Sequence, residues 1–155
     1  FGPYPVLGNN GPLRGWIGDV YDGCLRTPAL VNWPGVLKPQ VFDQVTSVLD
    51  WHPTLTALAK GRIDPSLRLE GRNIWSAIAD GEQLKPTTLY WRNSNGRRQA
   101  VRQNNWKLVF DSRTQMVELF DMQNDPQEKN NLAHTHPERV KQLQTVLAAQ
   151  LALDP

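Results

Sequence analysis

The sequence has little cysteine and no long apolar run, and each absence excludes a class of protein. Its single cysteine, Cys24, cannot form a disulfide within the chain, which excludes a disulfide-stabilised scaffold and leaves the redox compartment open. No run approaches the roughly 18 apolar residues that a membrane-spanning helix requires. The first residues show neither the basic nor the apolar segment of a signal peptide. The sequence therefore predicts no membrane association and leaves the localisation unknown.

An excess of charge of one sign is also absent. The chain has 17 basic and 15 acidic residues, which are interspersed and give a net charge of +2. This pattern forms no basic stripe for nucleic acid and no polybasic patch for a lipid surface, so neither partner is predicted. With 155 residues, of which 39% are hydrophobic, the chain can form one ordinary domain or one lobe of something larger.

Glycine and proline are abundant near the N-terminus, and the segments that follow differ in their apolar pattern. Residues 1–28 contain too many of both for regular structure, which predicts an extended surface loop. The short apolar run 28–33, stopped by Pro34 and Gly35, predicts a buried strand. Apolar residues at near-helical spacing then predict a helix over about residues 50–60, with uncertain limits.

A second short helix is expected after Asn73, which can cap it, and before Gly81, which can end it. From residue 87 the apolar period changes to that of strands, and four runs follow: Thr88–Arg92, Gln99–Gln103, Trp106–Phe110 and Met116–Phe120. Asn95-Gly96 is typical of a type I′ hairpin turn, and Asn104-Asn105 can adopt the positive φ values of a two-residue turn. The sequence therefore predicts a four-stranded antiparallel sheet.

The C-terminal segment is the expected cover for one face of this sheet. Thr135 and Glu138 form a capping-box pattern, and four apolar residues then recur at helical spacing: Val140, Leu143, Leu147 and Leu151. A similar pattern, from Asp125 to Glu128, predicts one further helical turn. We predict an α+β or α/β protein in two parts, residues 1–86 and residues 87–155.

Several segments, in the same order, resemble the sulfatase family. The first is residues 8–28, GNNGPLRGWIGDVYDGCLRTP, which resembles an arylsulfatase active-site loop of the form N-G-P-L-R-G-x-K. Residues 48–55 resemble a D-x-x-P-T-L helix start, and residues 69–75 resemble an L-D-G segment. Residues 100–133 resemble a closing A-V-R, W-K-L, E-L-F-D and D-P-x-E-x-x-N-L-A signature. The pattern is most similar to the branch that includes N-acetylgalactosamine-4-sulfatase.

This resemblance implies the C-terminal portion of an alkaline phosphatase-like sulfatase fold. Residues 1–86 would then be a remnant of the catalytic lobe, and residues 87–155 a C-terminal subdomain. Complete family members oxidise a Cys or Ser within C/S-x-P/A-x-R to formylglycine and use a bound divalent cation, usually calcium. They act on sulfated saccharides or aryl sulfates and are usually secreted, periplasmic or lysosomal.

The resemblance also implies that the catalytic groups are missing from this chain. Cys24 is followed by Leu25 and Arg26, which does not match the nucleophile motif, so we interpret Cys24 as a small structural residue. The family's acidic metal ligands precede the segments found here, and Asn9 would lack the carboxylate charge that a hard cation favours. His52, His134 and His136 are not clustered as zinc ligands would be. We therefore assign no catalytic residue and no metal or cofactor to the chain.

Ile17 occupies the position at which the family has its sulfate-binding lysine. Isoleucine has no cation or N–H donor on its side chain, and comparable electrostatic deletions cost roughly 10²–10³ in rate. Arg14 is a candidate to contact a substrate anion, although an ion pair with Asp19 or Asp22 that braces the loop is the simpler interpretation. Trp16 is a second candidate, which could stack on a sugar or aryl ring or else pack beneath the loop.

Three hypotheses follow for function. The chain can be the C-terminal portion of a sulfuric ester hydrolase, inactive alone, whose partner is a missing N-terminal lobe or a second copy. It can be a non-catalytic sulfatase-like module that binds a partner or an anionic saccharide. It can also be a fragment with no independent role.

Overall fold

The computed structural model describes residues 9–154, and its contacts divide the chain into two compact units. One unit joins the N-terminal loop, up to Pro28, to Thr87 and the residues beyond it, and the other is Ala29–Pro86. The sequence-based division placed the loop with residues 29–86. The structure instead packs Val20 and Tyr21 of the loop against the sheet, because these side chains complete an apolar cluster there.

The sheet of the first unit is a four-stranded antiparallel meander, as predicted. Its strands are β1 (Thr88–Arg92), β2 (Arg98–Gln103), β3 (Trp106–Asp111) and β4 (Met116–Asp121), hydrogen-bonded in chain order. The predicted type I′ turn at Asn95-Gly96 is wrong, since that turn needs two positive φ values and only Gly96 has one, at 69°. Asn104 has a φ of 55° in the next connection.

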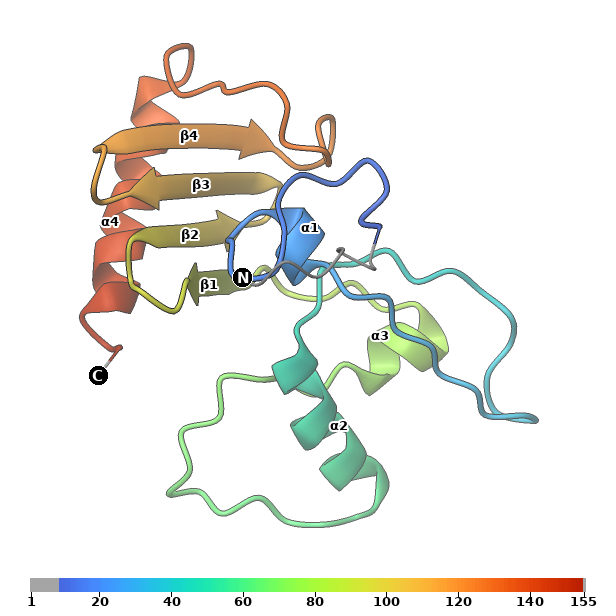
Figure 1. Ribbon diagram of the computed structural model, residues 1–155. Coiled ribbons are helices and arrows are strands. Elements are labelled where there is room, and N and C mark those ends of the chain that lie inside the picture. Colours follow the sequence, from blue (N-terminus) through green and yellow to red (C-terminus); the bar gives the residue numbers. More distant parts are fainter. Residues whose placement is uncertain (1–8, 155) are drawn as a thin grey trace, which may run out of the picture. The chain divides into compact units, whose positions relative to one another are not determined.

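Helix α4 (Pro137–Leu151) covers one face of the sheet, as Figure 1 shows behind the strands. Leu143 and Leu147 of α4 are buried against Val101, Leu108 and Leu119, which confirms the predicted cover. The predicted capping box is wrong, because the hydroxyl of Thr135 donates to the backbone oxygen of Leu132 and caps no N–H of α4.

The opposite face of the sheet is covered by the N-terminal loop and its short helix α1 (Asp22–Leu25). A buried cluster on this face joins the loop to the strands: Val20, Tyr21, Ala100, Val109, Phe120 and Met122. Both faces of the sheet are therefore buried within this unit, by elements from opposite ends of the described chain.

The helical turn predicted for residues 125–128 does not form. The carboxylate of Asp125 instead accepts hydrogen bonds from the backbone N–H groups of Lys129 and Asn130, at 3.1 and 2.7 Å. Glu128 has a φ of 56° and its side chain is buried. The left-handed backbone at Glu128 ends the segment as a turn, and directs a carboxylate to the interior.

The second unit contains three short helices: η1 (Val48–Asp50), α2 (Trp51–Leu58) and α3 (Trp75–Asp80). The predicted helix near residues 50–60 is confirmed. Gly81 ends α3 with a φ of 74°, as predicted. The N-cap residue of α3 is Ile74, which makes no side-chain cap, and Asn73, one residue earlier, accepts the N–H of Trp75 at 2.9 Å.

The buried strand predicted for residues 28–33 is absent from the described chain. This segment is irregular, and Leu30 is 93% exposed. A strand needs a hydrogen-bonded neighbour, and the only sheet that the structure describes consists of β1–β4, none of which pairs with residues 28–33. Apolar composition alone therefore did not produce a strand here. Within residues 9–154, no helix is long and apolar enough to cross a membrane.

Candidate functional site

The loop carries an exposed turn at residues 16–19. The N–H of Asp19 donates to the carbonyl of Trp16 at 3.0 Å, and Gly18, the third residue, has a φ of 88°. This combination is typical of a type II β-turn, in which glycine occupies the position with positive φ. Ile17 precedes Gly18 at the outermost point of the turn and is 69% exposed. The position at which sequence comparison expects a lysine therefore faces outward from this unit.

Arg14 attaches the start of the loop to the sheet. Its guanidinium lies 2.9 Å from a carboxylate oxygen of Glu118 on β4, and 3.9 Å from the centre of the Tyr21 ring. The Tyr21 hydroxyl also donates to Glu118. The predicted bracing role is supported, but the partner is Glu118 and not Asp19 or Asp22. Glu118 is 104 residues away in sequence, so no local pattern could have identified it.

The environment of Tyr21 keeps its phenol protonated. Burial, followed by the hydrogen bond and the negative charge of Glu118, raises the pKa of Tyr21 well above its ordinary value. Tyr21 is thus a hydrogen-bond donor in this cluster and supplies no base.

Asp19, at the end of the turn, is attached to β2. Its carboxylate oxygens accept hydrogen bonds from one guanidinium nitrogen of Arg98 at 2.9 and 2.7 Å. Arg98 also contacts Asp111, whose carboxylate pairs with Arg97 at 2.8 Å. The hydrogen bond from Arg97, opposed by burial and reinforced by two backbone N–H groups, holds the pKa of Asp111 well below its ordinary value. A chain of ion pairs therefore links the turn to two strands.

A third cluster lies at the beginning of α1 and is buried. Lys107 on β3 is fully buried, and its Nζ lies 2.7 Å from Oδ1 of Asp22 and 2.7 Å from Oε1 of Glu128. Oε2 of Glu128 accepts the backbone N–H of Asp22 at 2.8 Å. Burial, only partly opposed by the positive charge of Lys107, raises the pKa of Glu128.

Sequence reasoning did not bring these three residues together: it considered Asp22 as an ion-pair partner of Arg14 and Glu128 as part of a helix-capping pattern, and it assigned no role to Lys107. Lys107 lies between Trp106 and Leu108 on a strand, at a position that faces the loop side of the sheet. A lysine at an inward-facing strand position was the available signal, because a fully buried ammonium requires paired carboxylates. Its two partners could not be chosen from the sequence.

Trp16, the second candidate for substrate contact, is half-buried, a position compatible with both stacking on a ring and packing under the loop. Asn9 and Asn10 are engaged within the loop: the Asn9 side chain accepts the N–H of Gly11 at 2.8 Å, and the Asn10 side chain donates to the Gly15 carbonyl at 2.8 Å. Cys24 is a free cysteine, half-buried in α1. These contacts give Asn9 and Asn10 local structural roles.

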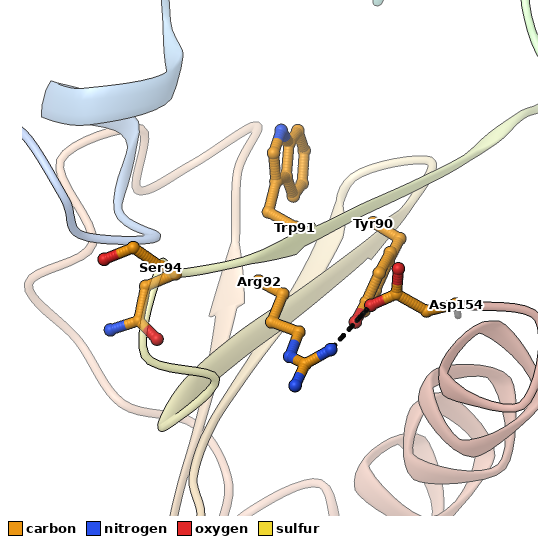
Figure 2. A pocket seen from close by; sticks show the side chains of 6 residues that line it. Tyr90, Trp91, Arg92, Ser94 and Asp154 are labelled. Atoms are coloured by element: carbon orange, nitrogen blue, oxygen red, sulfur yellow. Dashed lines mark hydrogen bonds and ion pairs between the residues drawn. The ribbon is translucent and has the colours of Figure 1, made fainter.

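A shallow depression on the same unit is shown in Figure 2. It is lined by β1, the following turn and the C-terminal end: Tyr90, Trp91, Arg92, Asn93, Ser94 and Asp154. Asp154 accepts hydrogen bonds from Tyr90 and Arg92, both at 3.1 Å. Arg92 and Asp154, the charged groups of this depression, are therefore paired with each other.

A bound metal ion needs several His, Cys, Asp or Glu side chains grouped around one point. Among the residues that the structure describes, no three His, Cys, Asp or Glu side chains gather as a metal site. The carboxylates of Asp22 and Glu128 lie close together, but Lys107 already neutralises part of their charge. Residues 9–154 therefore do not fit a calcium centre by themselves.

Comparison with known proteins identifies the family to which this chain is related. Residues 16–153 match the family model described as N-sulphoglucosamine sulphohydrolase, C-terminal. Mouse arylsulfatase J is 31% identical over 124 residues, which cover 66% of this chain and 20% of that protein. An N-acetylgalactosamine-6-O-sulfatase from Bacteroides thetaiotaomicron is 26% identical over 151 residues, covering 88% and 29% of the two chains.

Solved structures resemble the fold over most of its length. The crystal structure of Ps i-CgsB superposes with a TM-score of 0.75 at 28% identity, covering 93% of this chain and 32% of that one. The same protein has been solved in complex with k-i-k-neocarrahexaose. A protein from a study of glycosaminoglycan metabolism by Bacteroides thetaiotaomicron superposes with a TM-score of 0.76 at 24% identity, over 89% of this chain and 32% of that one. The chain thus spans about a third or less of the length of these relatives.

Proposed function

Since this chain belongs to the sulfatase family and forms its C-terminal domain, we propose that it supplies the substrate-facing loop of a sulfuric ester hydrolase. In this proposal the complete enzyme hydrolyses the sulfate ester of a saccharide or an aryl alcohol. The chain alone is inactive, because it contains no C/S-x-P/A-x-R nucleophile motif and no grouped metal ligands within residues 9–154.

The observation that carries the proposal is the turn at residues 16–19, which is exposed at its tip and attached at both ends. Arg14 on one side pairs with Glu118, and Asp19 on the other side pairs with Arg98. Such attachments hold a contact residue in place before the ligand arrives, which lowers the entropy cost of binding.

Ile17 gives the turn an apolar tip, and this bears on the substrate. Arg14 and Arg98, the cations beside the turn, are already paired with Glu118 and Asp19. The tip therefore offers contact to an apolar face of the substrate, such as the C–H face of a sugar or an aryl ring. Any cation that stabilises the developing charge on sulfate would then belong to another part of the enzyme.

A divalent cation, calcium in the family pattern, would be held by residues outside this chain. Its chemistry would be to polarise the sulfate ester. None of the contacts described for residues 9–154 depends on it. The contribution of this chain is the placement of the loop.

The experiment compares the complete gene product with the 155-residue chain in the turnover of a chromogenic aryl sulfate. We expect turnover by the complete product and none by the chain alone. Turnover by the chain alone would overturn its assignment as an inactive part. A complete gene product without the nucleophile motif, or without activity on aryl and saccharide sulfates, would overturn the hydrolase assignment.

The matched variant for this experiment is Ile17→Lys, with Gln144→Lys as a control at an exposed position of α4. A charged lysine at the tip would lose the apolar contact that Ile17 offers to the substrate, which is worth roughly 1–3 kcal/mol, so we expect kcat/KM to fall by roughly tenfold or more while the control leaves it unchanged. Equal effects of the two substitutions would show that the tip does not contact the substrate.

A second candidate function is binding without catalysis, and Ile17 in place of the lysine favours it. A non-catalytic module would bind a protein partner or an anionic saccharide through the same loop. Titration of the chain with sulfated sugars, with free sulfate as the control, tests it. Failure to bind at millimolar ligand, together with failure to capture a partner, would contradict this second function.

The exposed apolar side chains of residues 29–86 support a protein partner for that unit, either the N-terminal lobe of the enzyme or a second copy of the chain. They include Leu30, Val41, Val48, Leu49 and Leu55. Exposed apolar side chains in this number favour burial against protein. A strictly monomeric chain that binds no hydrophobic dye would contradict this part of the proposal.

A further inference from the structure

Asp22 is the residue through which the base of the loop is joined to the interior of the sheet. Its carboxylate lies 2.7 Å from Lys107 Nζ, and its backbone N–H donates to Glu128 at 2.8 Å. Glu128 lies 2.7 Å from the same Nζ. Asp22, Lys107 and Glu128 form a closed ring of contacts, which we call the buried triad.

The buried triad replaces a local cap of α1. The residue before α1, Tyr21, makes no side-chain capping bond. Glu128, 106 residues from Asp22 in sequence, accepts the first N–H of the helix instead. A carboxylate at a helix N-terminus is favoured by both the free N–H groups and the helix dipole. The position of α1 is thus determined by residues outside the loop.

Lys107 connects this position to the centre of the sheet. It lies on β3, an internal strand, where it is opposite Arg102 of β2 and Phe120 of β4. A lysine on an internal strand cannot follow movement of a surface loop. Asp22 must therefore stay where Lys107 and Glu128 hold it.

The turn at residues 16–19 is connected to Asp22 by a close backbone contact. Gly23, the next residue, donates its N–H to the carbonyl of Arg14 at 2.7 Å. A Cβ on Gly23 would lie 2.5 Å from that carbonyl oxygen, so the two strands of the loop touch at this point. The contact closes the loop, and movement of Asp22 would displace the turn that carries Ile17.

We propose that Lys107 and Glu128 are positioning residues, which act through Asp22 to hold the Ile17 turn in the orientation that meets the substrate. The orientation toward substrate rests on the proposed function. Both side chains are completely buried, so they act through the loop and make no substrate contact from this unit.

The test uses Asp22→Asn in the complete gene product. This change removes the charge that joins the loop to Lys107, while Lys107 keeps Glu128 as its partner. Hydrogen–deuterium exchange is compared for peptides covering residues 14–25 and α4. We expect exchange in residues 14–25 to be faster by about tenfold to a hundredfold, the range expected for loss of a charge-assisted hydrogen bond. Exchange in α4 should not change.

The control is Asp154→Asn, which breaks the exposed pair with Arg92 on the same unit and should leave both peptides unchanged. A spin label at Ile17→Cys, with the free Cys24 changed to Ser so that the label has a single thiol in this chain, provides a second measurement: Asp22→Asn should make the label more mobile, and Asp154→Asn should not. In enzymatic assays, Asp22→Asn should lower kcat by more than it raises KM, since the misplaced turn weakens contacts made in the transition state.

The outcomes separate this inference from the proposed function. Unchanged exchange in residues 14–25 would overturn the positioning role, and so would equal acceleration in α4, because the effect would then be global. A local acceleration with no change in kcat or KM of an active enzyme would also overturn it. If the unaltered gene product hydrolyses no sulfate ester, the proposed function fails, while exchange and label mobility still decide whether the buried triad holds the loop.

Discussion

Replacing Lys107 by methionine should destabilise the chain more than any single ion-pair deletion at its surface. Methionine is similar to lysine in length and fills the same space, so the change removes mainly the charge. Asp22 and Glu128 would then face each other as two buried carboxylates without a cation. Breaking a buried ion pair by removal of one partner costs roughly 3–5 kcal/mol. We expect a loss of about 4 kcal/mol in the free energy of unfolding, near the middle of that range.

The assay is urea unfolding of the chain, followed by circular dichroism and tryptophan fluorescence. Arg92→Met is the matched control, because it breaks the exposed pair with Asp154 and should cost no more than about 1 kcal/mol. The triple change Asp22→Asn, Lys107→Met and Glu128→Gln should recover part of the loss, since neutral amides are less costly to bury than carboxylates. A loss for Lys107→Met equal to that of Arg92→Met would refute the reasoning.

Two further predictions concern the sheet and the loop. Because its partners hold the pKa of Asp111 low in the folded state, its contribution to stability is present above its ordinary pKa of 3.8 and is lost as the pH falls toward the lowered value. The difference in free energy of unfolding between the unaltered chain and Asp111→Asn should therefore be constant near neutral pH and shrink below 3.8; a constant difference at all pH values would contradict this. Gly23→Ala should cost about 3 kcal/mol, because the new Cβ would meet backbone oxygen atoms that cannot rotate away. Gly18→Ala should cost about 1–2 kcal/mol, because its new Cβ would lie in open space and the cost is only the backbone strain of a φ of 88°. A larger loss of stability for Gly18→Ala than for Gly23→Ala in urea unfolding would show that the loop is not closed at Gly23.

Local patterns predicted the four strands and helix α4 of the sheet unit well, but they did not predict α1. Alternation of apolar and polar residues identified all four strands, and the helical spacing of Leu143 and Leu147 identified both α4 and the face it covers. These predictions succeeded because periodicity records which side of an element is buried. The residue types around Ile17 also predicted which loop is the candidate site.

The incorrect predictions share another cause. Thr135 and Glu128 belong to sequences that resemble capping boxes, but neither caps the expected helix. Residues 28–33 have the composition of a strand and have no strand neighbour in the described chain. In each case the backbone or the side chain had a choice of partner, and a local pattern cannot compare partners that are distant in sequence.

The sequence by itself determined the family, the four strands and the final helix, and the exposed position of interest, because these depend on residue type and on spacing along the chain. The tertiary structure alone decided that Arg14 pairs with Glu118, that Asp19 pairs with Arg98, and that Asp22 pairs with Lys107 and Glu128. The physical reason is that a charged side chain of the loop can pair with any opposite charge that folding brings within reach. Only the packing of the loop on the sheet brings these partners into contact. Asp19 and Arg98 are 79 residues apart in sequence, Arg14 and Glu118 are 104 apart, and Asp22 and Glu128 are 106 apart.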